Sequence, residues 1–294
     1  IDHHKVNKRA MDVLARCGGL DGLDPDGNRA RMLAELPEAT QAAEQYQRDL
    51  ESGQVDLFGN FAERSAPHIT EHRDVQPWSR LLELQAEKSS LGLYLTGHPV
   101  ELQADDLARF TTCTLANVKK QVPSEGKGRR RGTPMTLAGL VHDVRKRGNR
   151  GGFVAIEDHT GRMEVSLFDD AWTLYADLLQ KDEIIVVEVS VGTNSFTGGV
   201  LAKVQKVMPL SDAKTRFARG VRITLKGPDE EMYNRLKYVF APYRDGSDQV
   251  WLEYSNARAR AHLELGAEWG VKACEELVAA LGELDIVSEA RLVY

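Results

Sequence analysis

Two strands joined by a tight turn are predicted in residues 153–168, which read FVAIEDHTGRMEVSLF. The second half alternates apolar and polar residues, with Met163, Val165 and Leu167 on one face. Such alternation is typical of a strand that turns one side toward a core. The turn falls at residues 158–161, Asp-His-Thr-Gly, because Asp and Gly favour tight turns. This hairpin decides the fold, since period-two patterning continues on both sides of it.

The segments around the hairpin extend the pattern. A strand is predicted at residues 135–147 before it, and strands at 184–191 and 200–208 after it. A helix is predicted at residues 169–179, between the third and fourth strands. Three strands, a helix and two strands in this order are typical of a five-stranded Greek-key barrel of the OB type. The sequence therefore predicts a central all-β OB-fold barrel.

The whole chain is predicted to be multidomain, with an N-terminal α-helical segment, the central barrel and a C-terminal small α+β domain. In the first segment, Asn7 is expected to cap a helix that ends near Arg16. A second helix is expected at residues 28–36, and Pro37 is expected to begin a third. We predict five segments: helices over 1–50, a linker over 51–77, a helical or irregular connector with a basic linker over 78–134, the OB-fold domain over 135–210, and the α+β domain over 211–294.

The composition is typical of a globular protein, with 42% hydrophobic and 28% charged residues among 294. No run approaches the ~18 apolar residues of a membrane span, so no membrane partner is expected. Three widely spaced cysteines, Cys17, Cys113 and Cys274, argue against a disulfide framework or a cysteine zinc site and favour a reducing cytoplasm. Because the sequence begins at Ile1 without a Met or an apolar signal core, we expect a fragment of a longer chain.

Positive charge is concentrated in one region of an acidic chain. Residues 119–150 contain ten Lys or Arg and two Asp or Glu, a net charge of +8, whereas the whole chain carries −6. The remainder therefore carries −14. Such a basic region indicates a contact with nucleic-acid phosphates. The alternative is a solvated basic loop without a ligand.

The expected barrel offers a site for single-stranded nucleic acid, because OB folds bind strands across their second and third strands and the adjacent loops. Cations in the first loop could follow a phosphate backbone, and aromatic side chains could stack on bases. For Phe153, as for Phe168, the alternative is a place in the barrel core. The candidate residues are Arg145, Lys146, Arg147, Asn149, Arg150, Phe153, Phe196 and Lys203.

A short peptide in the linker is the sharpest local motif. It consists of Gln54, Val55, Asp56, Leu57 and Phe58. It resembles the peptide by which bacterial polymerases and repair proteins bind the sliding clamp, with a Gln, two variable residues, a Leu or Met, and a Phe. Burial of two apolar anchors would contribute roughly 3–6 kcal/mol before ordering costs. The alternative is that Leu57 and Phe58 pack back onto the neighbouring helices.

Motifs along the whole chain resemble, in order, those of bacterial replicative DNA polymerase III alpha subunits. They are VNKRA at 6–10, GGLD at 18–21, LGLYLTGHP at 91–99, RGNR at 147–150, EDHTGR at 157–162, VSLF at 165–168, ARG at 218–220 and ARAR at 257–260. The clamp-like peptide lies where that family keeps its internal clamp motif. The resemblance therefore identifies the chain as a C-terminal fragment of a family C polymerase.

The resemblance implies three partners: the sliding clamp (beta), the tau subunit of the clamp loader, and single-stranded template DNA. Residues 220–294 carry a net charge of −4, which by itself favours a protein partner for this domain over DNA. The family's catalytic aspartates lie upstream, so this fragment should contain no active site, metal site or cofactor. The parent polymerase is expected to use Mg²⁺.

Two other functions fit parts of the pattern. One is the anticodon-binding part of an aminoacyl-tRNA synthetase, which shares the OB pattern but needs nucleotide-binding motifs that the sequence lacks. The other is a stand-alone single-strand binder, which leaves the peptide at residues 54–58 and the acidic last domain unexplained. Within the resembling family, the intact clamp-like peptide and tail favour the main replicase over an error-prone paralogue.

Overall fold

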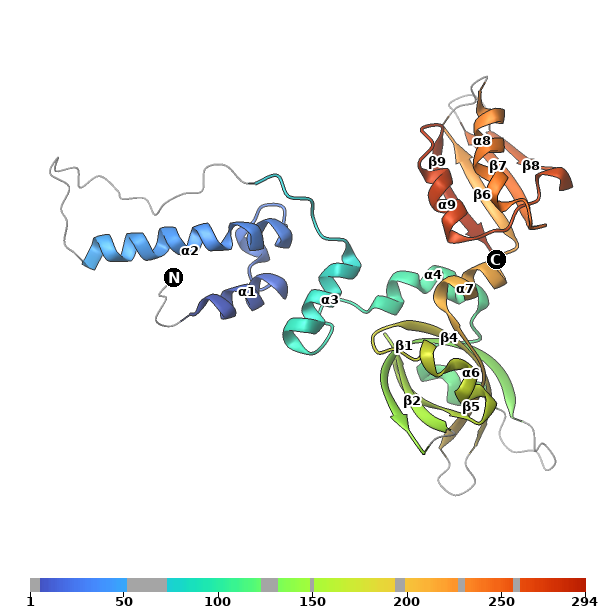
Figure 1. Cartoon of the computed structure of the whole chain (residues 1–294), viewed down its shortest axis with the longest axis horizontal. Helices are drawn as coiled ribbons and strands as arrows, with labels where there is room; N and C mark the ends of the chain where they lie inside the picture. The colour runs from blue at the N-terminus through green and yellow to red at the C-terminus, as the bar shows by residue number, and fades with distance from the viewer. Residues whose placement is uncertain are drawn as a thin grey trace. The chain divides into compact units, whose positions relative to one another are not determined.

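The computed structural model divides the chain into two units, Ile1–Pro99 and Val100–Tyr294 (Figure 1). Each unit has its own elements and is described by itself. Unit 1 is helical, and unit 2 contains all the strands among the described residues. The structure describes residues 6–51, 73–122, 132–148, 151–193, 199–226, 231–255 and 260–294.

The described residues of unit 1 form three α-helices, α1 (Lys8–Arg16), α2 (Arg29–Glu51) and α3 (Arg80–Leu91), and a short 3₁₀ helix at Asp21–Leu23. The predicted cap of α1 is confirmed, because the Asn7 side chain accepts a hydrogen bond from the Ala10 backbone N at 2.8 Å. Ser79 caps α3 in the same way, and Gly92 ends α3 with a left-handed φ of 79°. A φ of this sign favours glycine.

The predicted break at Pro37 is wrong, because α2 is continuous and contains this proline. Proline removes one backbone hydrogen bond inside a helix. The surrounding residues are mostly Ala, Leu, Glu, Gln, Arg and Met, which are strong helix formers. Their combined preference outweighs the single lost bond, so two expected helices form one.

A buried ion pair joins α2 to α3. The Arg29 side chain is 5% exposed and the Glu87 side chain 0%, and Arg29 Nη1 lies 3.1 Å from Glu87 Oε1. Arg29 also contacts Asp21, whose Oδ2 lies 2.8 Å from Nη2. Glu87 accepts hydrogen bonds from the backbone N of Leu95 and Thr96, and from the Thr96 hydroxyl. This pair therefore fixes two helices and the turn after α3.

Five strands of unit 2 close into a barrel in the order β1-β2-β3-β5-β4. Trp172, on α6, packs into the barrel core with Leu137, Ile156, Leu167 and Val187. The predicted five-stranded barrel, with its helix between the third and fourth strands, is confirmed. The elements are β1 (Thr133–Lys146), β2 (Gly151–Asp158), β3 (Gly161–Phe168), α6 (Asp170–Tyr175), β4 (Ile184–Thr193) and β5 (Val200–Pro209), with a 3₁₀ turn at Ala176–Leu178.

The turn between β2 and β3 also holds the connector that precedes the barrel. Asp158 Oδ1 accepts hydrogen bonds from the backbone N of Thr160 and Gly161 at 2.7 and 2.9 Å. Its Oδ2 accepts the backbone N–H of Leu115 at 2.9 Å. Leu115 and Val118 belong to the barrel core. The end of the expected connector is thus part of the barrel. From Pro99 onward, the described part of this connector contains a 3₁₀ helix at Pro99–Gln103, α4 (Ala104–Phe110), a 3₁₀ helix at Leu115–Asn117, and α5 (Val118–Gln121).

The last part of unit 2 is a four-stranded sheet in the order β8-β7-β6-β9, in which only the β6–β7 pair is parallel. Side chains from α8 and α9, including Leu236, Phe240 and Leu277, pack against Ile223 and Leu252 of the sheet. The elements are β6 (Gly220–Leu225), α8 (Met232–Phe240), β7 (Gln249–Ser255), β8 (Arg260–Glu264), α9 (Glu275–Gly282) and β9 (Val287–Val293), with 3₁₀ turns at Ala241–Tyr243 and Ala267–Trp269.

A helix that the sequence reasoning missed, α7 (Leu210–Phe217), links the barrel to this sheet. The buried Lys214 ammonium on α7 lies 2.7 Å from Gln103 Oε1, 3.0 Å from Asp106 Oδ2 and 2.6 Å from Glu275 Oε1. These partners come from the connector and from α9. All three ammonium protons therefore have an acceptor, and Lys214 joins three segments that are far apart in sequence.

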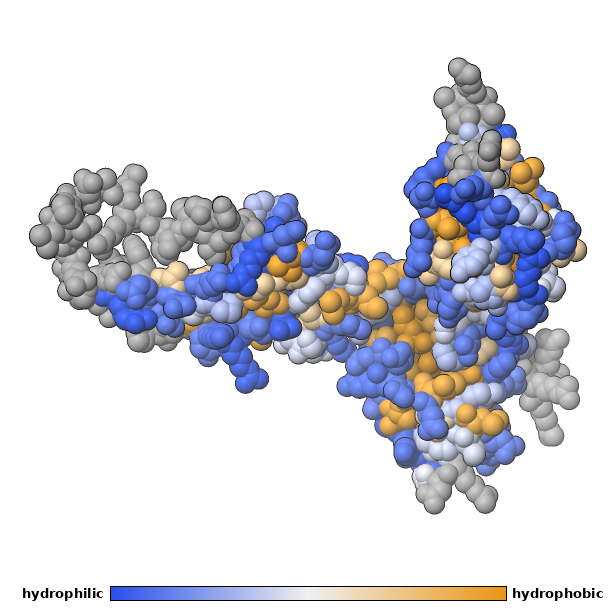
Figure 2. Space-filling model, turned by 45° about the horizontal axis from the view of Figure 1, so that its top comes forward, coloured by the Kyte–Doolittle hydropathy of each residue, from blue (hydrophilic) through white to orange (hydrophobic). Residues whose placement is uncertain are grey.

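The visible surface of the described residues is mostly hydrophilic, with hydrophobic areas between the hydrophilic ones (Figure 2). Among the described residues, no helix combines the length and the apolar content needed to cross a membrane.

Removal of the Glu87 carboxylate should destabilise unit 1. Glu87→Ala leaves the buried Arg29 with Asp21 as its remaining ion-pair partner among the described residues, which should cost about 3 kcal/mol. Hydrogen-exchange mass spectrometry of peptides from α2 and α3 would measure the loss. Glu83→Ala is a matched control on α3, because Glu83 forms a more exposed pair with Arg80 and should cost under about 1 kcal/mol. Equal losses in both variants would contradict a structural role for the buried pair.

Unit 1 should also lose stability in acid. Burial by itself raises the pKa of Glu87, but the hydrogen bonds from Thr96, Leu95 and Arg29 outweigh it and lower the pKa from 4.5 to about 2. Because the folded pKa lies below the unfolded one, the stabilisation is complete above about pH 4.5 and is lost as the pH falls toward 2. Protection of α2 and α3 should therefore fall across this window in the native chain and less steeply in Glu87→Ala.

Candidate functional site

The outer faces of β2 and β3 are set by strand alternation. Val154 and Ile156 on β2, and Val165 and Leu167 on β3, are fully buried in the barrel core. Successive side chains of a strand point to opposite faces. Phe153 and its outward neighbours on both strands therefore point away from the core, as the alternating burial of β2 and β3 shows.

Barrel closure brings three of the predicted residues into one row. Arg145 on β1 pairs with Phe153 on β2, and Phe153 pairs with Ser166 on β3. Ser166 in turn pairs with Lys203 on β5, through the parallel contact that closes the barrel. The row thus crosses four strands, and its two cations flank an aromatic ring. We call these four residues, Arg145, Phe153, Ser166 and Lys203, the transverse row.

The aromatic ring of the row is half-buried and lies outside the barrel core. The rings of Phe153 and Phe168 meet edge to face, with centroids 5.7 Å apart. Gly151 makes room for this pair, because a Cβ there would lie 2.4 Å from Cδ1 of Phe168 and 2.8 Å from the Leu167 carbonyl oxygen. The alternative interpretation of Phe153 and Phe168 as core residues is therefore wrong. The two rings form an apolar patch on the outer surface of the barrel.

Carboxylates share this face with the cations. Arg145 forms an ion pair with Glu164, and a longer one with Asp143 at 3.8 Å. Ala155 on β2 pairs with Asp143 on β1 and with Glu164 on β3. The Arg145 side chain therefore crosses Ala155 to contact Glu164. The small Ala155 side chain leaves this path open. Acids on β1 and β3 therefore already neutralise the cation that the sequence reasoning treated as free.

A second ion-pair group lies further along the same strands. Arg162 Nη2 lies 2.6 Å from Glu157 Oε2, and His142 Nδ1 lies 3.2 Å from the same oxygen. The sequence reasoning counted Asp143 but missed Glu157 and Glu164, because it summed charge over residues 119–150 only. The register of the β2–β3 hairpin could have placed Glu164 beside Ala155 from the sequence alone. The pairing of β1 with β2, which brings Arg145 close to Glu164, could be known only from the tertiary structure.

The remaining predicted site residues divide into two groups. Lys146 and Arg147 are exposed at the end of β1, next to the row. Asn149, Arg150 and Phe196 lie outside the described residues, as do all five residues of the clamp-like peptide. In the part of the chain that the structure describes, no group of three or more His, Cys, Asp or Glu side chains could hold a metal ion.

Two family models match within unit 2. The OB-fold nucleic acid binding domain matches residues 135–210, which contain the barrel and the transverse row. The DNA polymerase III subunit alpha C-terminal domain matches residues 235–284, between α8 and the turn after α9.

Curated relatives cover nearly the whole chain. The DNA polymerase III subunit alpha of Vibrio cholerae is 37% identical over 290 residues, which are 97% of this chain and 24% of the relative. The Escherichia coli K12 subunit is 36% identical over 94% of this chain and 24% of its own length. The Pseudomonas aeruginosa subunit is 36% identical over 96% of this chain and 25% of its own length.

The chain belongs to the DNA polymerase III alpha subunit family. It spans about a quarter of the length of these relatives. The matched C-terminal domain and the OB-fold barrel identify it with the C-terminal part of the subunit. The family resemblance predicted from the sequence is thereby confirmed.

Glu164 should weaken nucleic-acid binding at the transverse row, because it competes with phosphate for Arg145. Glu164→Gln keeps the side-chain shape and removes the charge, so affinity for a labelled single-stranded oligonucleotide should rise about two- to fivefold at low salt. Fluorescence anisotropy would measure the change. Glu188→Gln on β4 is the matched control, because Glu188 pairs with Arg216 of α7 rather than with the row. An equal rise in both variants would indicate only a general charge effect.

Proposed function

We propose that this chain holds a replicative DNA polymerase on its template and on its protein partners. The observation that carries the proposal is the transverse row on an OB-fold barrel, in which Arg145 and Lys203 stand at the two ends of a row that contains Phe153. The similarity to alpha subunits along 94–97% of the chain supports the setting in DNA replication.

Single-stranded template DNA is the proposed nucleic-acid ligand. An aromatic ring between two cations can stack on a base while the cations contact the phosphates on either side. Lys146 and Arg147, both exposed, extend the positive charge toward the first barrel loop. A base in a duplex has no free face, so this arrangement favours a strand whose bases are unstacked.

The sliding clamp is the proposed partner of residues 54–58. These residues fall between the end of α2 at Glu51 and the first described residue of the next segment, Arg73. The proposal rests on the likeness of Gln54, Leu57 and Phe58 to a clamp-binding peptide. Two apolar anchors would give the weak, exchangeable contact that a moving polymerase needs.

The tau subunit of the clamp loader is the proposed partner of the last domain. This domain carries a net charge of −4 over residues 220–294, which disfavours DNA as its ligand. Its match to the C-terminal domain of the alpha subunit covers residues 235–284. A protein ligand therefore fits it better than a nucleic acid.

Catalysis belongs, in this proposal, to the rest of a longer polymerase. A DNA-directed polymerase needs a carboxylate cluster that binds two Mg²⁺ ions. Within the described residues no such cluster is present. A replicative role places the protein in the bacterial cytoplasm. A primer-extension assay tests the proposal, because nucleotide incorporation by this chain alone would contradict it.

The two other candidate functions explain less of the chain. An anticodon-binding module or a stand-alone OB protein would account for the barrel but not for similarity that also covers the helical unit and the last domain. The replicative proposal accounts for all three parts.

Loss of the Phe153 ring should weaken single-strand binding. Phe153→Ala should lower the affinity for a labelled oligonucleotide about tenfold, because stacking of one base contributes about 1–3 kcal/mol. The control is Leu174→Ala, since Leu174 is an apolar side chain on α6 that is 69% exposed and lies outside the row. Affinity should also fall as salt rises, because cations in the row replace counterions. An affinity that does not change with salt concentration would exclude phosphate binding.

Loss of both clamp anchors should release the clamp. The double variant Leu57→Ala with Phe58→Ala should bind immobilised clamp at least about tenfold more weakly, which corresponds to about 1.4 kcal/mol. Substitution of Val55 by Ala is the control, because that position varies in the resembling peptides. Unchanged affinity in the double variant would refute the assignment of residues 54–58.

A further inference from the structure

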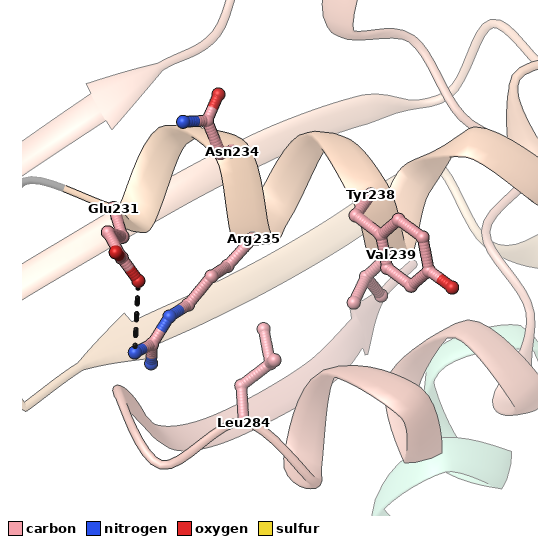
Figure 3. A pocket seen from close by; sticks show the side chains of 6 residues that line it. All are labelled: Glu231, Asn234, Arg235, Tyr238, Val239 and Leu284. Atoms are coloured by element: carbon pink, nitrogen blue, oxygen red, sulfur yellow. Dashed lines mark ion pairs between the residues drawn. The ribbon is translucent and has the colours of Figure 1, made fainter.

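A groove on the last domain has no assigned function. It has a volume of about 410 Å³ and lies along α8 beside the turn after α9 (Figure 3). Leu236 and Phe240 of α8 face the core, so the groove uses the other side of the helix. The lining residues are Glu231, Asn234, Arg235, Tyr238, Val239 and Leu284.

An exposed aromatic side chain stands beside an apolar floor. Tyr238 is 82% exposed, the largest value among the large hydrophobic and aromatic side chains whose exposure is known. Val239 and Leu284 are half-buried and contact the hydrophobic core from the groove side. In Figure 3 the Tyr238 ring lies in front of Val239, and Leu284 faces both from the opposite wall. Tyr at such a position is common among residues that dominate binding interfaces.

The mouth of the groove is acidic. Glu231 and Asp285 are 77% and 79% exposed, and both form ion pairs with Arg235. Arg235 Nη2 lies 3.7 Å from Glu231 Oε2, and Nη1 lies 2.6 Å from Asp285 Oδ1. Of the residues that line the groove, Glu231 and Arg235 carry opposite charges. Asp285, which follows the lining residue Leu284 and pairs with Arg235, adds one negative charge beside the aromatic ring. A cation is attracted both by carboxylates and by the face of a tyrosine ring.

The opposite face of the sheet lacks these properties. Its outward Arg222 and Arg291 lie at 3.4 Å from Glu253 and 3.9 Å from Glu289, so charges of both signs alternate there. The groove, unlike this face, combines an apolar floor with an exposed aromatic ring and an acidic rim.

We propose that this groove binds a peptide segment of a protein partner that carries a Lys or Arg next to an apolar side chain. The apolar side chain lies against Val239 and Leu284, and the cation contacts Tyr238 and the acidic mouth. The inference rests on the proposed function, since it names the face by which the last domain meets the clamp-loader subunit.

The experiment measures binding of the purified tau subunit to the immobilised 294-residue chain. Tyr238→Ala and Asp285→Lys should each lower the affinity at least tenfold, and binding by the native chain should weaken as salt rises. Both side chains are exposed, so neither substitution opens the core, and thermal melting checks this. Matched controls are Leu263→Ala, at a 55% exposed apolar side chain on β8, and Glu289→Lys, at a 60% exposed acid on β9. Both controls should bind tau normally.

The outcomes separate the two levels of the proposal. If the native chain binds tau and both groove variants bind equally well, the groove is the wrong face and the partner assignment stands. If the native chain does not bind tau, the partner assignment itself fails. A native dimer that Tyr238→Ala dissolves, or oligonucleotide binding that Asp285→Lys strengthens, would overturn the peptide as occupant in favour of a second copy or of DNA.

Discussion

The parallel contact between β3 and β5 is the constraint on which the candidate site depends. It consists of the register pairs Val165–Ala202 and Ser166–Lys203, and the Ser166 hydroxyl adds a hydrogen bond to the Ala202 carbonyl at 3.0 Å. This short seam closes the barrel and buries Val165 and Ala202 inside it. The same seam places Lys203 beside β3, although β4 and the helix α6 separate the two strands in sequence. Without closure, the cation would lie on the far edge of an open sheet.

Ion pairs on the barrel face limit the affinity that the transverse row can have for phosphate. Arg145 pairs with Glu164 and Asp143, and Arg162 pairs with Glu157, so these two arginines already have carboxylate partners. Phosphate must displace these acids before it gains a full contact. Exposed ion pairs contribute only about 0–1 kcal/mol each, so displacement is possible but lowers the net affinity. In the proposed function, weak and sequence-tolerant binding would let the chain move along its template.

The last domain is attached to the barrel through polar and aromatic contacts. Burial by itself lowers the pKa of Lys214, but its hydrogen bonds to Glu275 and Asp106 outweigh burial and raise the pKa, so the ammonium stays charged. Beside it, the rings of Phe110 and Phe217 stack with centroids 5.0 Å apart, and Tyr294 lies 5.3 Å from Phe110. The connector, α7 and the C-terminal end therefore meet at one joint, which lies apart from the groove on α8.

The sequence by itself determined the local elements and the class of the barrel. Alternation in residues 153–168 and the turn at Asp158 fixed a hairpin, because side-chain period and turn chemistry are properties of neighbouring residues. The cap at Asn7 was readable for the same reason. Rules based on neighbouring residues failed at two places. At Pro37, the helix preference of the surrounding residues outweighed the helix-breaking effect of one proline. At α7, the buried face is defined by residues that are far away in sequence.

Only the tertiary structure decided which residues form a site. The charge count along the chain included Arg145 and Asp143 but not Glu164, because Glu164 becomes a neighbour of Arg145 only when β1, β2 and β3 pair. Likewise, the sequence could not place Phe153 outside the core, since both faces of β2 carry apolar residues. Contacts between distant segments depend on strand register and barrel closure. The transverse row and the groove on α8 are both products of those contacts.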